Sequence, residues 1–358
     1  PALDAALLED VARAGVAVIS GRVAQTAERD GHWTAELRGA DGSRRRVTAS
    51  FLIEARGRAA PAGGARRLSG PATTALLQCR TGEPQEPAAG VVPFRDGWAW
   101  MARLGDGRRY VQFAVTSASG RLPGRAGLAS HYEQLLAGLP EAARWFEGAQ
   151  PAAPVAARTA GAVLHPAPVG TRSLRVGDAA LAVDPLSGNG LFQALSTGLM
   201  AVAVVHTMLR RPGDAALAAG FYRDRVTESF RRFARIGRDF YRQERRWPDS
   251  PFWTERSAWP DDLPAHPAPD SKPMAIAARP VVENGFIVMR DVVVTADQPL
   301  GIWRLDGVEL APLIRRLRDE PERADEPMKA RISRLSGATS GQVETVAAWL
   351  WQRLGAPR

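Results

Sequence analysis

Alternation of hydrophobic and polar residues predicts a series of strands in the first part of the chain. Leucines at helical spacing first predict a helix over Pro1–Ala14, and the apolar run Val16–Ile19 then predicts a strand. Ala40–Ser43 contains Asp-Gly, which is typical of a hairpin turn. The strands predicted around this turn and after it are Arg22–Thr26, His32–Arg38, Arg44–Ser50 and the buried strand Phe51–Ala55.

A second group of strands follows a segment rich in Gly, Pro and Arg. This segment, Pro61–Pro84, predicts a crossing between domains. We expect helices at Leu128–Leu136 and Glu141–Phe146, between a meander and a returning strand. The strands of this part are Gly90–Phe94, Gly97–Arg103, Arg109–Val115 and Val155–His165.

Two long helices are predicted in the middle of the chain. The apolar run Gly190–Leu209 contains Gln193 and His206, so it predicts a buried central helix and not a membrane span. Phe221–Arg245 follows with an apolar stripe and interleaved arginines. Such a basic helix could bind an acidic partner, but it is more typical of a domain-bridging helix with a solvated face.

The last part of the chain predicts a separate module after the Pro- and Asp-rich linker Trp259–Pro273. Two strands and three helices favour a winged-helix-like unit. Its final helix begins at Ser340 and has no arginine before Arg353, so protein or peptide docking, or packing, is favoured over DNA binding. The elements are strands at Gly285–Thr295 and Gly301–Leu305, and helices at Val308–Leu317, Pro327–Leu335 and from Ser340.

Composition narrows the picture without fixing a function. The chain has 358 residues and a net charge of +9, and its only lysines are Lys272 and Lys329. An acidic partner or an arginine-favouring codon bias would each explain this, and we favour the bias. Cys79 is the single cysteine, which excludes an internal disulfide and fits the cytoplasm. The scattered histidines show no metal-ligand spacing, so no metal site is predicted.

The stretch Ser173–Leu195 carries the candidate chemistry. It predicts a strand, a Gly-Asp turn, the loop Asp184–Gly190 and the start of a helix. The glycines allow close approach of the backbone to a ligand. The helix N-terminus directs free N–H groups to the same place, which suits a negatively charged ring or oxyanion.

These residues also resemble a known fingerprint. Gly177-Asp178-Ala179-Ala180, with Asp184-Pro185 and Gly188-x-Gly190, is similar to the second FAD motif of para-hydroxybenzoate hydroxylase-like flavoproteins. The resemblance implies FAD as cofactor, with Asp178 at the ribityl chain and the Pro185–Gly190 loop along the isoalloxazine. Pro185 and Gly188 would lie nearest the chemistry. The implied cofactor-binding residues are Val23, Arg58, Gly177, Asp178, Pro185, Gly188, Asn189, Gly190 and Leu191.

Further residues refine the resemblance. Leu181 stands where aromatic hydroxylases usually have His, and the Asp184–Gly188 run is closer to flavin halogenases and to flavoproteins that modify Trp during quinone-cofactor maturation. The run around Trp247-Pro248-Asp249 favours the maturation group. Trp98-Ala99-Trp100 is similar to the halogenase W-x-W element but continues Met-Ala-Arg, so we expect the two rings to be sheet core.

The implied fold class is mixed α/β (α+β). It comprises a Rossmann-like FAD domain without its N-terminal part, a β-sheet substrate domain and the winged-helix-like module. No G-x-G-x-x-G follows a strand, so we expect the pyrophosphate fingerprint upstream of Pro1 and weak FAD binding by this polypeptide alone. The predicted parts are 1–60 and 166–215 for FAD, 61–165 for substrate, 216–265 for the bridging helix and 266–358 for the module.

The implied function is that of an FAD-dependent monooxygenase. It would hydroxylate an aromatic ring through a flavin C4a-hydroperoxide. The substrate would be a protein- or peptide-bound Trp during quinone-cofactor biogenesis, as for quinohemoprotein amine dehydrogenase, with an external flavin reductant or NAD(P)H. One alternative is a flavin-dependent halogenase. Another is a non-catalytic protein that binds a partner or DNA.

Overall fold

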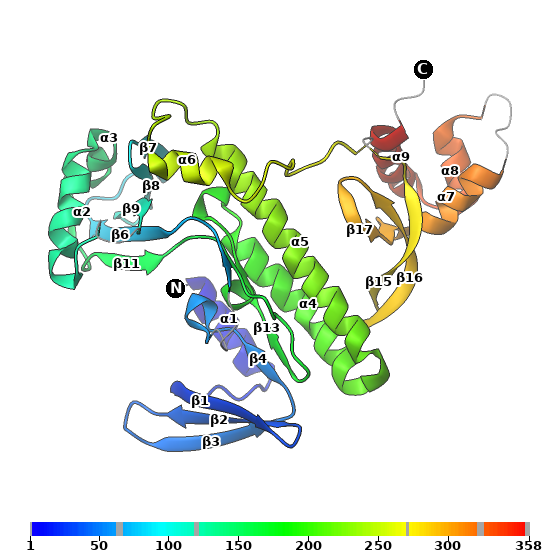
Figure 1. Ribbon diagram of the computed structural model, residues 1–358, viewed down its shortest axis with the longest axis horizontal. Coiled ribbons are helices and arrows are strands. Elements are labelled where there is room, and N and C mark those ends of the chain that lie inside the picture. The colour runs from blue at the N-terminus through cyan, green and yellow to red at the C-terminus, as the bar shows by residue number, and fades with distance from the viewer. Residues whose placement is uncertain (1, 62–66, 118–121, 270–271, 321–325, 355–358) are drawn as a thin grey trace. The chain divides into compact units, whose positions relative to one another are not determined.

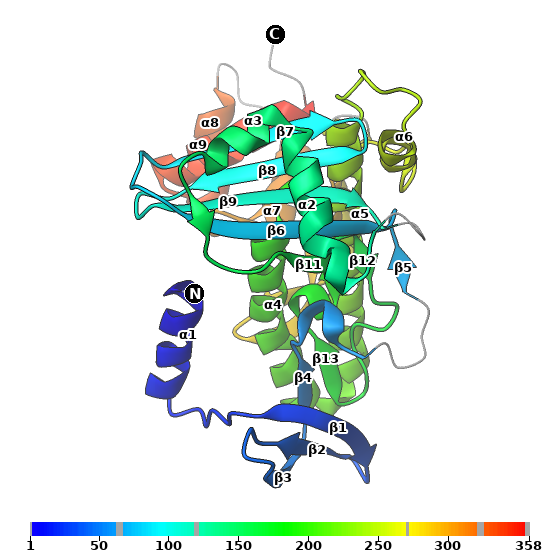
Figure 2. The ribbon, with the colours of Figure 1, turned by 90° about the vertical axis from the view of Figure 1, so that its left-hand side faces the viewer.

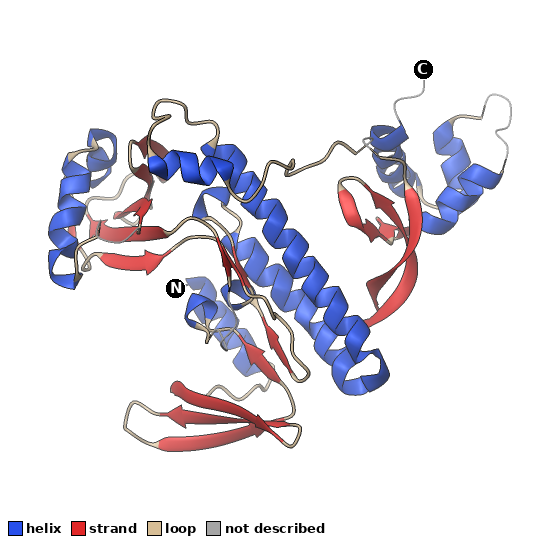
Figure 3. Cartoon of the chain, in the orientation of Figure 1, coloured by secondary structure: helices blue, strands red, loops and turns tan. Residues whose placement is uncertain are grey.

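The computed structural model describes residues 2–61, 67–117, 122–269, 272–320 and 326–354, so Pro1 of the first predicted helix lies outside the described residues. The chain divides into two compact units. The first contains residues 1–54 and 170–174, and the second contains residues 55–169 and 175–358. Both units contain helices and strands (Figure 3). The five-part division expected from the sequence stays a prediction.

The first unit is built on an antiparallel meander in the order β1-β2-β3. The predicted hairpin at Ala40–Ser43 joins β2 and β3, and Gly39 N–H donates to the Ser43 carbonyl. Asp30 and Gly31 both have positive φ and turn β1 into β2. The elements are α1 (Ala2–Arg13), β1 (Arg22–Arg29), β2 (His32–Arg38), β3 (Arg44–Ala49) and β4 (Leu52–Glu54), which pairs with β13 (Ser173–Arg175).

Two predictions for this unit were wrong. Val16–Ile19 forms no strand, because its backbone pairs with no other strand among the described residues. The strand predicted over Phe51–Ala55 is only three residues long and is not buried throughout, since Ile53 is exposed while Glu54 is buried. A short apolar run does not by itself reveal whether a neighbouring strand is present on both sides.

The second unit contains a six-stranded antiparallel sheet that is covered on one face by α2 (Figure 2). Side chains alternate between its faces. Ala99, Met101 and Phe113 pack against Tyr132 of α2, whose hydroxyl donates to the Val111 carbonyl at 2.9 Å. The elements are β6 (Thr73–Thr81), β7 (Ala88–Phe94), β8 (Gly97–Arg103), β9 (Arg108–Thr116), β10 (Gln150–Pro151), β11 (Ala156–Thr159), α2 (Leu128–Ala137) and α3 (Pro140–Ala143).

The predictions for β6 and for the returning strand were wrong. β6 lies inside the segment predicted as a crossing, because its first residues are buried on both faces and show no alternation. The strand predicted over Val155–His165 is interrupted at Gly161, whose close approach to the Pro71 carbonyl leaves no room for a Cβ. Its second part, β12 (Val163–Leu164), joins β5 (Leu68–Ser69) and β14 (Leu181–Ala182) in a small sheet of order β14-β12-β5.

The two long helices α4 (Gly190–Arg210) and α5 (Ala215–Tyr241) lie side by side (Figure 1). α4 is not the buried helix that its composition predicts. Its side with Ala201 and Val204 is buried, but Leu199 and Val202 are 76% and 63% exposed. By length and composition alone α4 could cross a membrane, but core helices meet the same criterion, so no membrane assignment follows.

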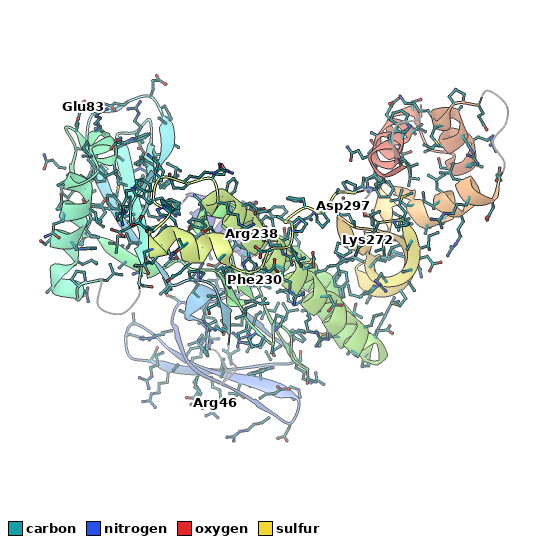
Figure 4. The ribbon with its side chains drawn as sticks, turned by 45° about the horizontal axis from the view of Figure 1, so that its top comes forward. Arg46, Glu83, Phe230, Arg238, Lys272 and Asp297 are labelled. Atoms are coloured by element: carbon teal, nitrogen blue, oxygen red, sulfur yellow. The ribbon has the colours of Figure 1, made fainter. Side chains whose placement is uncertain are left out.

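Part of the arginine set on α5 does not form the solvated face that the sequence predicts, although Arg223 and Arg231 are exposed. Arg235 forms two hydrogen bonds of 2.9 Å with the Asp261 carboxylate, and Arg242 binds Asp262 at 2.6 Å. Arg238, which lies on the same helix as Phe230 (Figure 4), is buried and donates to the Asp261 carbonyl. These bonds attach the segment after Trp259 to α5. Between Trp247 and Trp259 the chain forms the short helix α6 (Pro251–Ala258).

In the part of the C-terminal module that the structure describes there are a three-stranded sheet in the order β15-β16-β17 and three helices. β15 was missed, although Asn284-Gly285 with positive φ at both positions is a strong hairpin signal. A winged-helix arrangement stays a prediction. The elements are β15 (Ala275–Glu283), β16 (Phe286–Thr295), β17 (Gln298–Ile302), β18 (Arg304–Leu305), β19 (Val308–Glu309), α7 (Leu310–Asp319), α8 (Met328–Ser336) and α9 (Ser340–Leu354).

The module packs on its own core and also touches the long helices. Leu310, Ile332 and Leu350 are fully buried in that core. The Thr207 hydroxyl of α4 accepts the Ile287 N–H at 2.8 Å, and His206 stacks on Phe286 with ring centroids 5.3 Å apart. A buried hydrogen bond and an aromatic stack therefore join β16 to α4.

We expect Gly301→Ala to lower the free energy of unfolding by about 3 kcal/mol, because it combines a positive φ with overpacking. Gly301 has a φ of +80°, and a Cβ there would lie 2.2 Å from Cγ2 of Val292. Gly337 has a φ of +67° with open space around it, so Gly337→Ala should cost only about 1 kcal/mol. Urea unfolding of both variants tests this, and equal losses would contradict the steric argument.

Candidate functional site

The Gly-Asp turn is fastened to the start of α4. It lies in a 3₁₀ turn, η4 (Gly177–Ala179), and Gly177 has a φ of +56°. The Gly177 N–H donates to the Thr197 hydroxyl at 2.8 Å, and this hydroxyl donates to the Gln193 carbonyl at 2.8 Å. Glycine satisfies the left-handed conformation here. The turn is thereby held over the second turn of α4.

The loop after β14 is rigid because its polar groups bind one another. Asp184 precedes a second 3₁₀ turn, η5 (Pro185–Ser187), and its carboxylate accepts the Leu186 N–H at 2.9 Å. The Ser187 hydroxyl donates to the Asp184 carbonyl at 2.7 Å. Gly188 then takes a φ of +68° and reverses the chain toward α4.

There is free space around the glycines that lead from this loop into α4. Side chains at Gly188 and Gly190 would meet no protein atom within 4 Å. Asn189 donates its amide to the Ser187 carbonyl and does not cap the helix. The first N–H groups of α4 therefore have no side-chain cap and can donate hydrogen bonds to a carbonyl or an anion.

Arg58 and Asp178 form a polar pair beside the turn. The Arg58 Nε lies 3.2 Å from Oδ2 of Asp178, and the same guanidinium donates to the Gly161 carbonyl. Both side chains remain partly exposed. They border a cavity of about 300 Å³ whose other walls include Arg67, Ser69, Gly70, Thr73, Ser117 and Thr159.

A second cavity, of about 400 Å³, lies against the other end of the loop, and we call it the aromatic cavity. Strand register places Val91, Trp100 and Gln112 in one row across β7, β8 and β9. This row and Trp98 face Pro185, Leu186 and Gly188. The expectation that both tryptophans are sheet core is correct for Trp98, which is 3% exposed, but Trp100 is half-buried and lines the cavity.

Burial sets the protonation of the groups beneath the loop. Desolvation raises the pKa of Asp184, although the Leu186 N–H and the Tyr241 hydroxyl partly oppose this rise. Burial, reinforced by the neighbouring carboxylate, also raises the pKa of Tyr241 well above its usual range. Tyr241 is therefore a neutral hydroxyl that can donate to Asp184.

The structure gathers most of the residues expected at the site. Arg58, Gly177 and Asp178 lie together, and Pro185–Gly190 forms one continuous loop. Leu191 is 60% exposed on the first turn of α4. Val23 lies half-buried on β1 of the first unit. Their roles toward a cofactor stay predictions.

Sequence reasoning missed Thr197, Gln193 and Tyr241. Gln193 and Thr197 stand one helical turn apart on the buried side of α4, and polar residues inside an apolar helix were a usable signal. Tyr241 is one of several aromatic residues in the stripe of α5. No local pattern distinguishes it from its neighbours.

No family model matches the sequence, and no curated protein matches it. Among solved structures, the peptidyl tryptophan dihydroxylase QhpG, essential for tryptophylquinone cofactor biogenesis, is 44% identical over 98% of this chain and 78% of its own, with a TM-score of 0.78.

Two halogenases share the fold at lower identity. The flavin-dependent halogenase CmlS is 16% identical over 99% of this chain and 76% of its own, with a TM-score of 0.77. The myxobacterial chondrochloren halogenase CndH, a variant of the FAD-dependent halogenases, is 21% identical over 71% and 61%, with a TM-score of 0.62. They support the mixed α/β fold alone. The identity to QhpG over nearly the whole chain shows that this protein belongs to the family of the peptidyl tryptophan dihydroxylase QhpG.

Proposed function

We propose that this protein is an FAD-dependent monooxygenase that hydroxylates a Trp side chain held in a protein or peptide, during biogenesis of a quinone cofactor. One observation carries the proposal. A single rigid segment, from Gly177 to Gly190, borders a polar cavity at Asp178 and an aromatic cavity at Pro185. Kinship with QhpG supports the same chemistry.

The residues present fit an FAD isoalloxazine and ribityl chain. The space beside Gly188 and Gly190 would be filled by any Cβ, so a flat ring can approach the backbone there. The buried Nε2 of Gln193 has no hydrogen-bond partner among the described residues, which leaves a donor at the start of α4. Asp178 and Arg58 would hold the ribityl chain, and the first N–H groups of α4 would donate hydrogen bonds to the ring carbonyl.

The protein's own contribution is to bind, orient and exclude water. FAD, when bound, supplies the oxygen chemistry. Trp100 and Val91 offer an apolar wall to an aromatic ring, and Gln112 adds an amide beside it. Pro185 and Gly188 form the opposite wall, so a ring in this cavity lies next to the loop.

The finer organisation belongs to this proposal. Residues 1–60 and 166–215 would serve FAD binding, 61–165 the substrate, 216–265 a bridge, and 266–358 a winged-helix-like docking module. We further propose a cytoplasmic location, and an external flavin reductant or NAD(P)H as electron source.

The other two functions have less support. Halogenation rests on likeness of fold at low identity, and the W-x-W run lacks the halogenase continuation. For DNA binding, α9 would need a free start, but the Gln342 amide donates to the Asp306 carbonyl and Lys329 pairs with Glu344. The start of α9 is therefore engaged within the module.

The activity is tested by incubating the full-length protein with FAD, a reductant, oxygen and Trp-containing peptides. We expect mass spectrometry to find one or two added oxygen atoms on Trp. Matched peptides with Phe in place of Trp should be unchanged. Incorporation of chloride or bromide would instead identify a halogenase, and an unmodified Trp throughout would refute the proposed function.

Gly190→Ala separates cofactor binding from folding. The new methyl meets no protein atom, and alanine favours a helix by up to about 1 kcal/mol, so stability should not fall. The same methyl would collide with a bound ring. We expect fluorescence titration to show that the FAD dissociation constant rises at least tenfold, which is a loss of about 1.4 kcal/mol of binding free energy.

Gly198→Ala is the matched control for this variant. Gly198 also lies on α4, two turns farther along the helix, and a methyl group added there would meet no protein atom within 4 Å. Its FAD affinity should stay within twofold of the wild type. Equal affinity for all three proteins would show that the ring does not pack against Gly190.

A further inference from the structure

A buried chain of hydrogen bonds runs from the sheet to the loop. The Trp98 indole N–H donates to the Tyr241 hydroxyl at 3.2 Å. That hydroxyl donates to the Asp184 carboxylate, whose oxygens lie 3.0 and 3.2 Å away. The carboxylate also accepts the Leu186 N–H. All three side chains of this Trp98–Tyr241–Asp184 chain are buried, so the bonds are shielded from water.

The Trp98–Tyr241–Asp184 chain connects three separate elements. Trp98 comes from β8, Tyr241 is the last residue of α5, and Asp184 begins the loop. Gly237 of α5 faces Asp184, and a Cβ added there would lie in van der Waals contact with the aspartate Cβ at 3.5 Å. The gap that remains between them is about 10 Å³. That is about the smallest space that can hold one water molecule, so the contact is nearly closed.

Aromatic packing holds the tyrosine in this position. Its ring makes edge contacts with Phe252 and Trp253 of α6, with centroids 6.0 and 5.8 Å away. Trp253 in turn donates its indole N–H to the Phe94 carbonyl of β7 at 3.0 Å. The tyrosine hydroxyl is therefore fixed from both the helix side and the sheet side.

One end of this chain is a wall of the aromatic cavity, and the other end binds a residue of the opposite wall. Trp98 lies on its sheet side, and Leu186, whose N–H binds Asp184, lies on its loop side. We propose that Tyr241 is a positioning residue that sets the separation of these two walls and so selects a flat aromatic side chain as the occupant. The identity of that occupant rests on the proposed function.

The arginine side chains near Asp184 bind other acceptors and form no hydrogen bond with its carboxylate among the described residues. Arg256 is buried and donates to the Phe252 and Ala72 carbonyls at 2.9 Å and to the Thr73 hydroxyl at 2.7 Å. It and Arg58 lower the pKa of Asp184, but desolvation outweighs them and the net shift is upward. Among the described residues, Tyr241 is the one whose side chain donates a hydrogen bond to this carboxylate.

This raised pKa provides a signature that does not depend on FAD. The folded protein binds the Asp184 proton more tightly than the unfolded chain, whose Asp pKa is about 3.9. Stability therefore falls as pH rises from that value to the folded pKa. Removing the Tyr241 hydroxyl removes a bond that favours the carboxylate, so the folded pKa rises further and the fall extends to higher pH.

The first experiment follows thermal unfolding of the full chain from about pH 4 upward. Tyr241→Phe keeps the ring and should move the end of the stability loss to higher pH. Asp184→Asn should abolish the loss. Tyr132→Phe is the matched control, because it also removes a buried tyrosine hydroxyl with one hydrogen bond, on the far face of the sheet. An unchanged pH profile in Tyr241→Phe would overturn the coupling.

The second experiment measures binding of 3-methylindole, the Trp side chain alone, by calorimetry. We expect its dissociation constant to rise at least fivefold in Tyr241→Phe and to stay within twofold in Tyr132→Phe. Wild-type binding that Tyr241→Phe leaves unchanged, or no wild-type binding, would overturn the positioning role. Because no oxygen chemistry is involved, this result is separate from the peptide oxidation that tests the proposed function.

Discussion

The buried carboxylate of Asp184 is the point on which the loop between β14 and α4 depends. It accepts the Leu186 N–H from its own turn and the Tyr241 hydroxyl from α5. A carboxylate with 8% exposure must be satisfied by hydrogen bonds or be strongly destabilising. Its bonds thus determine where Pro185 and Gly188 lie, and with them the N-terminus of α4.

The sheet supplies the other half of the site through its two-residue repeat. One face is filled by Ala99, Met101 and Phe113 against α2, where close packing stabilises the domain. The opposite face carries Trp98 and Trp100. Trp98 is buried, whereas Trp100 is half-buried and lines the aromatic cavity. A single strand, β8, therefore serves both stability and the proposed recognition of an aromatic side chain.

Arginine acts in this protein mainly as a structural connector. Arg58 joins the Gly-Asp turn to the Gly161 carbonyl, and Arg235 grips Asp261 through both of its oxygens. The planar guanidinium can bind several acceptors at once, which lysine cannot do with the same geometry. Several arginines of this arginine-rich chain therefore bind partners inside the protein, whether or not a codon bias supplied them.

Local physics decided what could be predicted from the sequence alone. The Gly-Asp turn at Gly177, the hairpin at Asp41-Gly42 and the long helix α5 depend on residues near one another in the chain, so their sequence patterns predicted them. The resemblance of the Gly177–Gly190 segment to an FAD motif rested on the same local residues. Kinship with QhpG agrees with it.

Tertiary structure decided the rest, because the decisive partners are distant in sequence. Tyr241 meets Asp184 across 57 residues and Trp98 across 143, and nothing in either local pattern marks these encounters. The doubly buried start of β6 and the exposed side of α4 likewise depend on what packs against them. Sequence determined which residues could turn, pair or donate, and packing determined which of them met around the loop.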